Sequence, residues 1–119
     1  MPVNKKTNIG KIKISDDAIA TLAGTTVNEC YGIVGMTSKN YLKDGFSMIL
    51  GKDNYSKGVV IDNSKSGLKI DLYVIISYQV KISEVVDSVQ KRVRYELENA
   101  LNIDIKEVNV FVEGVQVNG

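Results

Sequence analysis

Hydrophobic and polar positions follow three successive patterns in the second half of the chain. From Leu68 to Tyr78 they alternate with a period of two, and near the middle both faces become apolar. From Ser83 to Leu101 the apolar residues recur at helical spacing, and from Ile105 to Val112 alternation returns. These patterns predict a central strand, an amphipathic helix and a last strand. A strand–helix–strand connection of this length predicts that the last strand runs parallel to the strand at Leu68–Tyr78.

The predicted helix carries one continuous apolar stripe. Its positions are Val86, Val89, Val93, Leu97 and Ala100. Ser83 is expected to cap the N-terminus, because its hydroxyl can accept a hydrogen bond from a free backbone N–H. Asp87 with Lys91, and Arg94 with Glu98, are spaced to form ion pairs on the outer side. The stripe indicates that this helix lies on the sheet.

The first half of the chain predicts a similar but shorter arrangement. Residues 1–8 are polar, and we expect a flexible arm. Gly10–Ile14 alternates as a strand, Ser15 supplies an N-cap, and apolar spacing predicts a helix to about Cys30. Ile33–Met36 then reads as a short strand.

Two further segments complete the predicted architecture. Val59–Ile61 and Leu68–Tyr78 flank a turn-rich cluster at 62–67, which predicts a hairpin. We expect residues 9–119 to form one α+β domain, a two-layer sandwich. Its mixed β-sheet would come from segments near residues 9, 33, 59, 68 and 105, with two long helices on one face.

Composition narrows the function. The chain has 119 residues, a formal charge of +1 and one cysteine, Cys30. A net charge this close to zero does not favour nucleic acid as a partner. A single cysteine cannot form an intramolecular disulfide. The longest apolar run, Leu72–Ile76, is too short to cross a bilayer. We therefore expect a cytoplasmic protein, at most peripheral at the inner face of the membrane.

Catalytic and metal-binding chemistry finds little support in the sequence. The chain has no histidine, so a serine or Cys30 lacks its usual base, and zinc lacks its usual ligands. Cys30 lies on the apolar face of the first helix, where a buried small hydrophobe is the favoured interpretation. Asp44, Asp53 and Asp62 are scattered without calcium-loop spacing. We predict no enzyme, no cofactor and no metal site.

Two glycine motifs resemble phosphate-binding loops only in part. In the segment 45–52, five residues separate Gly45 from Gly51, and Asp53 stands where a magnesium-binding serine or threonine is needed. Gly32-Ile-Val-Gly35 matches the G-x-x-G loop of KH domains, although its middle residues are apolar. A KH-like nucleic-acid-binding module remains the alternative function.

The segment from Tyr41 to Lys57 is the candidate partner-binding surface. It has no sustained period, and it combines an aromatic residue with aliphatic and basic ones. The candidate residues are Leu42, Lys43, Phe46, Ile49, Leu50 and Lys52, with Phe46 as the expected anchor. Leu42, Phe46, Ile49 and Leu50 share one side of a two-turn helix, so packing on the sheet as a third core element is the competing interpretation.

Several segments in order resemble the alkaline-shock-protein family of Gram-positive bacteria. They are Gly10–Ser15, Tyr31–Met36, Leu50–Val59, Asp71–Ile75, Val89–Val93 and Val108–Val115. The resemblance implies a small cytoplasmic α+β protein of cell-envelope stress response and homeostasis, with no catalytic residues to transfer. It also implies that a protein partner holds some members at the membrane.

The function expected from the sequence is a non-enzymatic scaffold or adaptor. It would act through protein partners, one of them membrane-anchored, and a second copy of the chain is left open as a partner. Nucleic acid is the less favoured partner.

Overall fold

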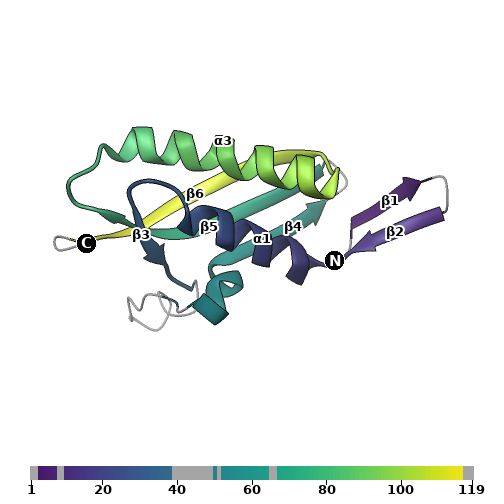
Figure 1. Ribbon diagram of the computed structural model, residues 1–119, viewed down its shortest axis with the longest axis horizontal. Helices are drawn as coiled ribbons and strands as arrows, with labels where there is room; N and C mark the ends of the chain where they lie inside the picture. The colour runs from purple at the N-terminus through teal and green to yellow at the C-terminus, as the bar shows by residue number, and fades with distance from the viewer. Residues whose placement is uncertain (1–2, 8–9, 39–49, 51, 65–66, 117–119) are drawn as a thin grey trace.

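The computed structural model describes residues 3–7, 10–38, 50, 52–64 and 67–116. The elements follow the predicted α+β class (Figure 1). In chain order they are β1 (Val3–Thr7), β2 (Gly10–Ile14), α1 (Asp16–Asn28), β3 (Ile33–Met36), the 3-10 helix η1 (Lys52–Gly58), β4 (Val59–Ser64), β5 (Gly67–Ser77), α3 (Ile82–Leu101) and β6 (Ile105–Gln116).

Strand β5 is the centre of the main sheet, as predicted. Strand β6 pairs with it in parallel along one side. On the other side β4 pairs antiparallel with its first half and β3 with its second half. The sheet is therefore mixed, and both the β4–β5 hairpin and the parallel crossover to β6 are confirmed.

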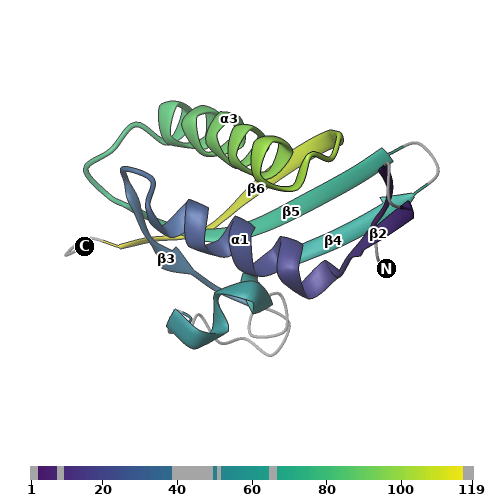
Figure 2. The ribbon, with the colours of Figure 1, turned by 45° about the vertical axis from the view of Figure 1, so that its right-hand side comes forward.

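Both helices cover the same face of this sheet (Figures 1 and 2). The residues of β5 that face them are buried and belong to one core: Leu68, Ile70, Leu72, Val74 and Ile76. Helix α3 contributes four buried residues to this core: Val85, Val89, Val93 and Leu97. The stripe thus begins at Val85 and not at Val86, which is partly buried, and Ala100 is exposed.

Helix α1 begins as predicted. The Ser15 Oγ accepts a hydrogen bond from the Ala18 N–H at 3.1 Å. The helix ends at Asn28, two residues before the expected end. At its centre Gly24 lets η1 approach closely, because a Cβ there would lie 2.9 Å from the Cβ of Tyr55. The 3-10 helix therefore packs directly on α1.

The start of α3 differs from the prediction. Its N-cap is Lys81, whose side chain makes no capping bond, and not Ser83. The Lys81 carbonyl accepts hydrogen bonds from the N–H groups of Glu84 and Val85, both at 3.1 Å. Ser83 lies inside the first turn. The helix starts earlier because Val80 packs against the core, which fixes the preceding turn.

The N-terminal segments also differ from the prediction. Residues 1–8 were expected as a flexible arm, but they contain β1, which pairs antiparallel with β2 in a separate two-stranded sheet. Strand β2 was expected in the main sheet and is not part of it. Strand β2 leads directly into α1. The β1–β2 hairpin projects past the end of the main sheet (Figure 1).

Candidate functional site: an apolar surface at one end of the sheet

In the described part of the chain, four of the six exposed large hydrophobic residues come from the end of the molecule where β5 passes into α3. Tyr31 is 84% exposed and Tyr78 is 64% exposed, while Ile82 and Val115 are 44% and 48% exposed. They come from the α1–β3 turn, the residue after β5, the first turn of α3 and the end of β6. We call these four residues the loop-end surface.

Backbone hydrogen bonds tie these separate segments together. The Ser77 N–H donates to the Gly32 carbonyl at 2.9 Å, which joins the end of β5 to the α1–β3 turn. The Tyr78 N–H donates to the Gln116 carbonyl, also at 2.9 Å, which joins it to the end of β6. The exposed side chains are therefore held on a rigid base, which lowers the entropy lost when a partner orders them.

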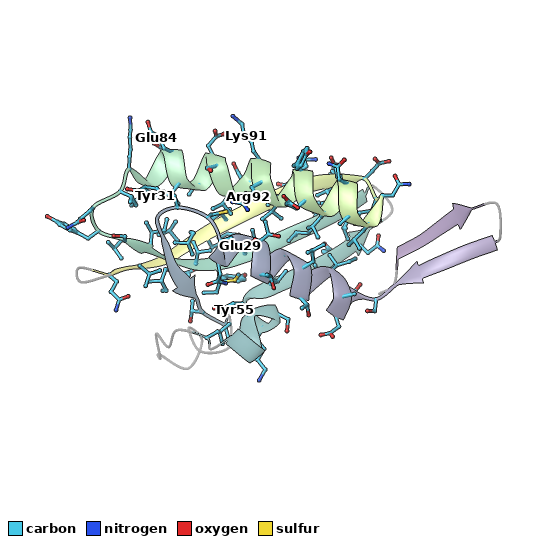
Figure 3. All side chains as sticks on the ribbon, in the orientation of Figure 1. Glu29, Tyr31, Tyr55, Glu84, Lys91 and Arg92 are labelled. Carbon is cyan, nitrogen blue, oxygen red and sulfur yellow. The ribbon has the colours of Figure 1, made fainter. Side chains whose placement is uncertain are left out.

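Gly32 is required for the position of Tyr31. Its φ is +88°, a conformation that favours glycine. A Cβ at this position would also lie 2.6 Å from the Cγ2 of Val85 in α3. The tight turn packs against the start of α3 and leaves Tyr31 facing outward, close to Glu84 (Figure 3).

Two shallow hollows adjoin at Tyr31 in the loop-end surface. Their volumes are about 360 Å³ and 470 Å³, and both are lined by Tyr31, Gln79 and Val80. The first hollow extends over the start of α3, and the second extends along β3. The first hollow has a mixed lining, in which polar side chains alternate with Val80 and Val85. Concave sites beside an exposed tyrosine are common places for anchor residues in protein interfaces.

Charged residues surround this apolar centre. Lys81 and Glu84 lie 3.9 Å apart in an exposed ion pair at the rim. Behind it Arg92 of α3 contacts Glu29 at the end of α1 at 3.7 Å, linking the two helices (Figure 3). Exposed pairs of this kind contribute little stability. An apolar and aromatic centre with a charged rim is typical of a surface that binds protein.

Cys30 lies beside this surface but is buried. Its Sγ donates to the Thr26 carbonyl at 3.4 Å. Burial raises the pKa of the Cys30 thiol, opposed by the charge of Arg92 and reinforced by Glu29. The thiol is therefore protonated at neutral pH, as expected for a buried small hydrophobe.

The glycine motifs do not form phosphate clamps among the described residues. Gly32 occupies a turn and Ile33–Met36 forms strand β3, so Gly32–Gly35 is not an exposed loop. Ile33 also packs against the core. Gly45 and Gly51 lie outside the described residues.

The candidate residues from the sequence are only partly located. Leu42, Lys43, Phe46 and Ile49 lie outside the described residues. Leu50 is 4% exposed and belongs to the core, so its side chain does not face a partner. Lys52 starts η1. The partner-binding surface expected at Tyr41–Lys57 therefore stays a prediction.

The loop-end surface was not predicted from the sequence. Its residues come from four segments that are far apart in the chain, so no local pattern unites them. One signal was present: Tyr31 directly precedes Gly32, and a glycine between a predicted helix and a predicted strand indicates a turn.

The described part of the chain contains neither a metal-binding cluster nor a membrane-spanning helix. No group of three or more histidine, cysteine, aspartate or glutamate side chains could hold a metal ion there. No described helix is long and apolar enough to cross a membrane.

Comparison with known proteins decides the family. Residues 4–117 match the model of the family of alkaline shock protein 23, described as having a cell envelope-related function. The chain belongs to this alkaline-shock-protein family. The resemblance seen in the sequence is therefore confirmed.

Relatives of this alkaline-shock-protein chain match it over 90–100% of its length. It is 44% identical over 119 residues to uncharacterized protein Spy1614 of Streptococcus pyogenes, covering 100% of this chain and 98% of that protein. It is also 44% identical to uncharacterized protein YloU of Bacillus subtilis, covering 98% of both chains. A stress response regulator gls24 homolog of Streptococcus pyogenes is 24% identical, covering 90% of this chain and 59% of that protein. No solved structure matches.

Proposed function

We propose that the chain is a non-enzymatic adaptor in cell-envelope stress response and homeostasis. It would act in the cytoplasm and bind a membrane-associated protein through the loop-end surface. Membership of a cell-envelope-related family and likeness to proteins named stress response regulators support the cellular context. The mechanism is inferred from the surface itself.

The single observation that carries the proposal is the gathering of four exposed hydrophobic residues at one end of the sheet. Two of them are tyrosines, which supply large contact area with few rotatable bonds. Apolar surface that is exposed to water is unfavourable, and a bound partner would bury part of it. Such a surface on a rigid base is suited to recognition of another protein.

A site-directed crosslink tests this function. A photoreactive phenylalanine analogue replaces Tyr31 in cells that encode the chain, and the captured proteins are identified from the membrane and soluble fractions. The matched control places the same analogue at Tyr95, which is 65% exposed on α3 and lies outside the loop-end surface. We expect the Tyr31 probe alone to capture a membrane-associated envelope protein.

Substitution of a second residue makes the test specific. Tyr78→Ser removes a large side chain from the loop-end surface without touching the probe, and it should reduce the Tyr31 capture several-fold. Equal capture from both probe positions, or capture only of nucleic acid, would contradict the adaptor function.

A further inference from the structure

The β1–β2 hairpin is strongly basic. Four of the 15 basic residues of the chain, and none of its 14 acidic residues, lie within residues 1–14. The four are Lys5, Lys6, Lys11 and Lys13. The rest of the chain therefore holds more acidic than basic residues, and the positive charge is concentrated at the hairpin.

The register of the hairpin divides its residues between two faces. Directly paired residues of antiparallel strands share a face, and successive residues along a strand alternate between faces. Lys6 pairs with Lys11, and Lys13 lies on the same face as this pair. The opposite face contains Val3, Lys5, Ile12 and Ile14. The hairpin is therefore amphipathic, with one lysine-rich face and one face that is mainly apolar.

The hairpin is set apart from the main sheet. Its two strands form a sheet of their own. They lie at the end of the molecule opposite the loop-end surface (Figures 1 and 2). A two-stranded sheet by itself is only marginally stable in water. A surface that covers its apolar face would therefore stabilise it.

One cross-strand pair of the hairpin is repulsive. Lys6 and Lys11 stand directly opposite each other, and like charges in this position destabilise a pair of strands. Lys13, on the same face, adds a further positive charge. An anionic surface would offset this repulsion, so binding to such a surface would also order the hairpin.

Two features favour lipid over nucleic acid as the source of the negative charge. Residues 3–14 contain no aromatic residue, on which bases stack, and no arginine, whose planar fork matches phosphate. They do place aliphatic residues on one face and lysines on the other. Amphipathic helices that lie in the membrane interface show the same division, with the apolar face at the boundary between headgroups and acyl chains.

We propose that the β1–β2 hairpin binds the surface of an anionic lipid bilayer directly. Val3, Ile12 and Ile14 enter the interface, and the acidic headgroups attract the lysines. The hairpin is a single layer thick, so the lysines of its outer face remain close to the headgroups. The attraction extends over about one Debye length, about 8 Å at physiological ionic strength.

This lipid contact goes beyond the proposed adaptor function and is compatible with it. A few lysines give weak, reversible attachment, and stable attachment to a membrane commonly takes two signals. The protein partner at the loop-end surface is one signal, and the hairpin is the second. Because the two sites lie at opposite ends of the molecule, the chain lies along the bilayer when both are bound (Figure 1).

Cosedimentation of the purified chain with lipid vesicles tests the proposal. One vesicle type contains equal parts of phosphatidylglycerol and phosphatidylcholine, and the other contains phosphatidylcholine alone. At low ionic strength we expect binding to the anionic vesicles only, and added salt should weaken it. Lys6→Gln/Lys11→Gln should weaken it more than about tenfold, because each lysine near an anionic surface contributes about fivefold. The matched control, Lys57→Gln/Lys91→Gln, changes two exposed lysines outside the hairpin and should bind as wild type does.

Two further measurements separate lipid binding from a general contact with polyanions. Ile12→Thr keeps every charge and a β-branched residue, yet it should weaken vesicle binding several-fold because less apolar surface enters the interface. Backbone amides of residues 3–14 should exchange hydrogen more slowly on anionic vesicles than in free solution.

Three results would overturn the proposal. They are a lack of binding to anionic vesicles, vesicle binding that neither hairpin variant weakens, and equally tight binding to a DNA duplex that Ile12→Thr leaves unchanged. None of them would alter the outcome of the Tyr31 capture, because the vesicles contain no protein partner.

Discussion

Val93 lies at the centre of α3 with no exposed surface, in the core between the helix and the sheet. Val93→Asp would bury a charge that has no ionic partner in this core. We expect a loss of about 3 kcal/mol or more in the free energy of unfolding, measured by urea denaturation. The matched control is Ser88→Asp, on the exposed side of the same helix, which should change stability by less than about 0.5 kcal/mol. Equal effects would contradict the packing of α3.

Predictions for single residues were correct where the interaction involves only neighbours in the chain. Ser15 was correctly predicted as an N-cap because its Oγ needs only an N–H three residues later. Ser83 has the same chemistry, but α3 begins before it, since packing of Val80 decides where the chain turns. Likewise, burial of Cys30 followed from helical spacing, whereas exposure of Tyr31 depends on a turn packed against α3.

At the scale of elements, the side chain of Arg94 connects α3 to β6. The Arg94 guanidinium donates to the carbonyls of Ile105 and Lys106 and contacts Glu98 at 3.6 Å. The sequence predicted the Glu98 pair but placed it on a solvated outer side. In the structure the pair joins the helix to the edge strand.

Arg94→Met should therefore destabilise the domain, because it removes donors from β6 while retaining an aliphatic side chain. We expect a loss of about 1–3 kcal/mol in unfolding free energy by urea denaturation. Arg92→Met is the control, since within the described residues Arg92 makes a single exposed ion pair, 3.7 Å from Glu29. It should cost less than about 1 kcal/mol. A larger loss of unfolding free energy for Arg92→Met than for Arg94→Met would contradict the stabilisation of β6 by α3.

Periodicity identified most elements but not all of them. Both long helices and the four strands of the main sheet followed from spacing of apolar residues, because each has one face on the core. The 3-10 helix η1 was missed, since its contact with α1 depends on Gly24 and Tyr55 meeting across the fold. The pairing of β1 with β2 was also missed, because Val3–Thr7 is short and mostly polar and shows no apolar alternation.

At the scale of the whole molecule, the fold and the family could be read from the sequence, but the candidate site could not. The order of weak segments pointed to the alkaline-shock-protein family because it spans nearly the whole chain. The loop-end surface requires four chain segments to meet at one end of β5, which only the tertiary structure specifies.

The central claim is that the loop-end surface connects the chain to a membrane-associated protein. The most direct measurement is the fraction of the chain that sediments with membranes, compared between wild type and a Tyr31→Ser/Tyr78→Ser double variant. Tyr95→Ser serves as the control for loss of an exposed tyrosine. We expect the double variant to lose most membrane association while its melting temperature stays unchanged, and the control to match wild type. Unchanged sedimentation of a folded double variant would contradict the claim.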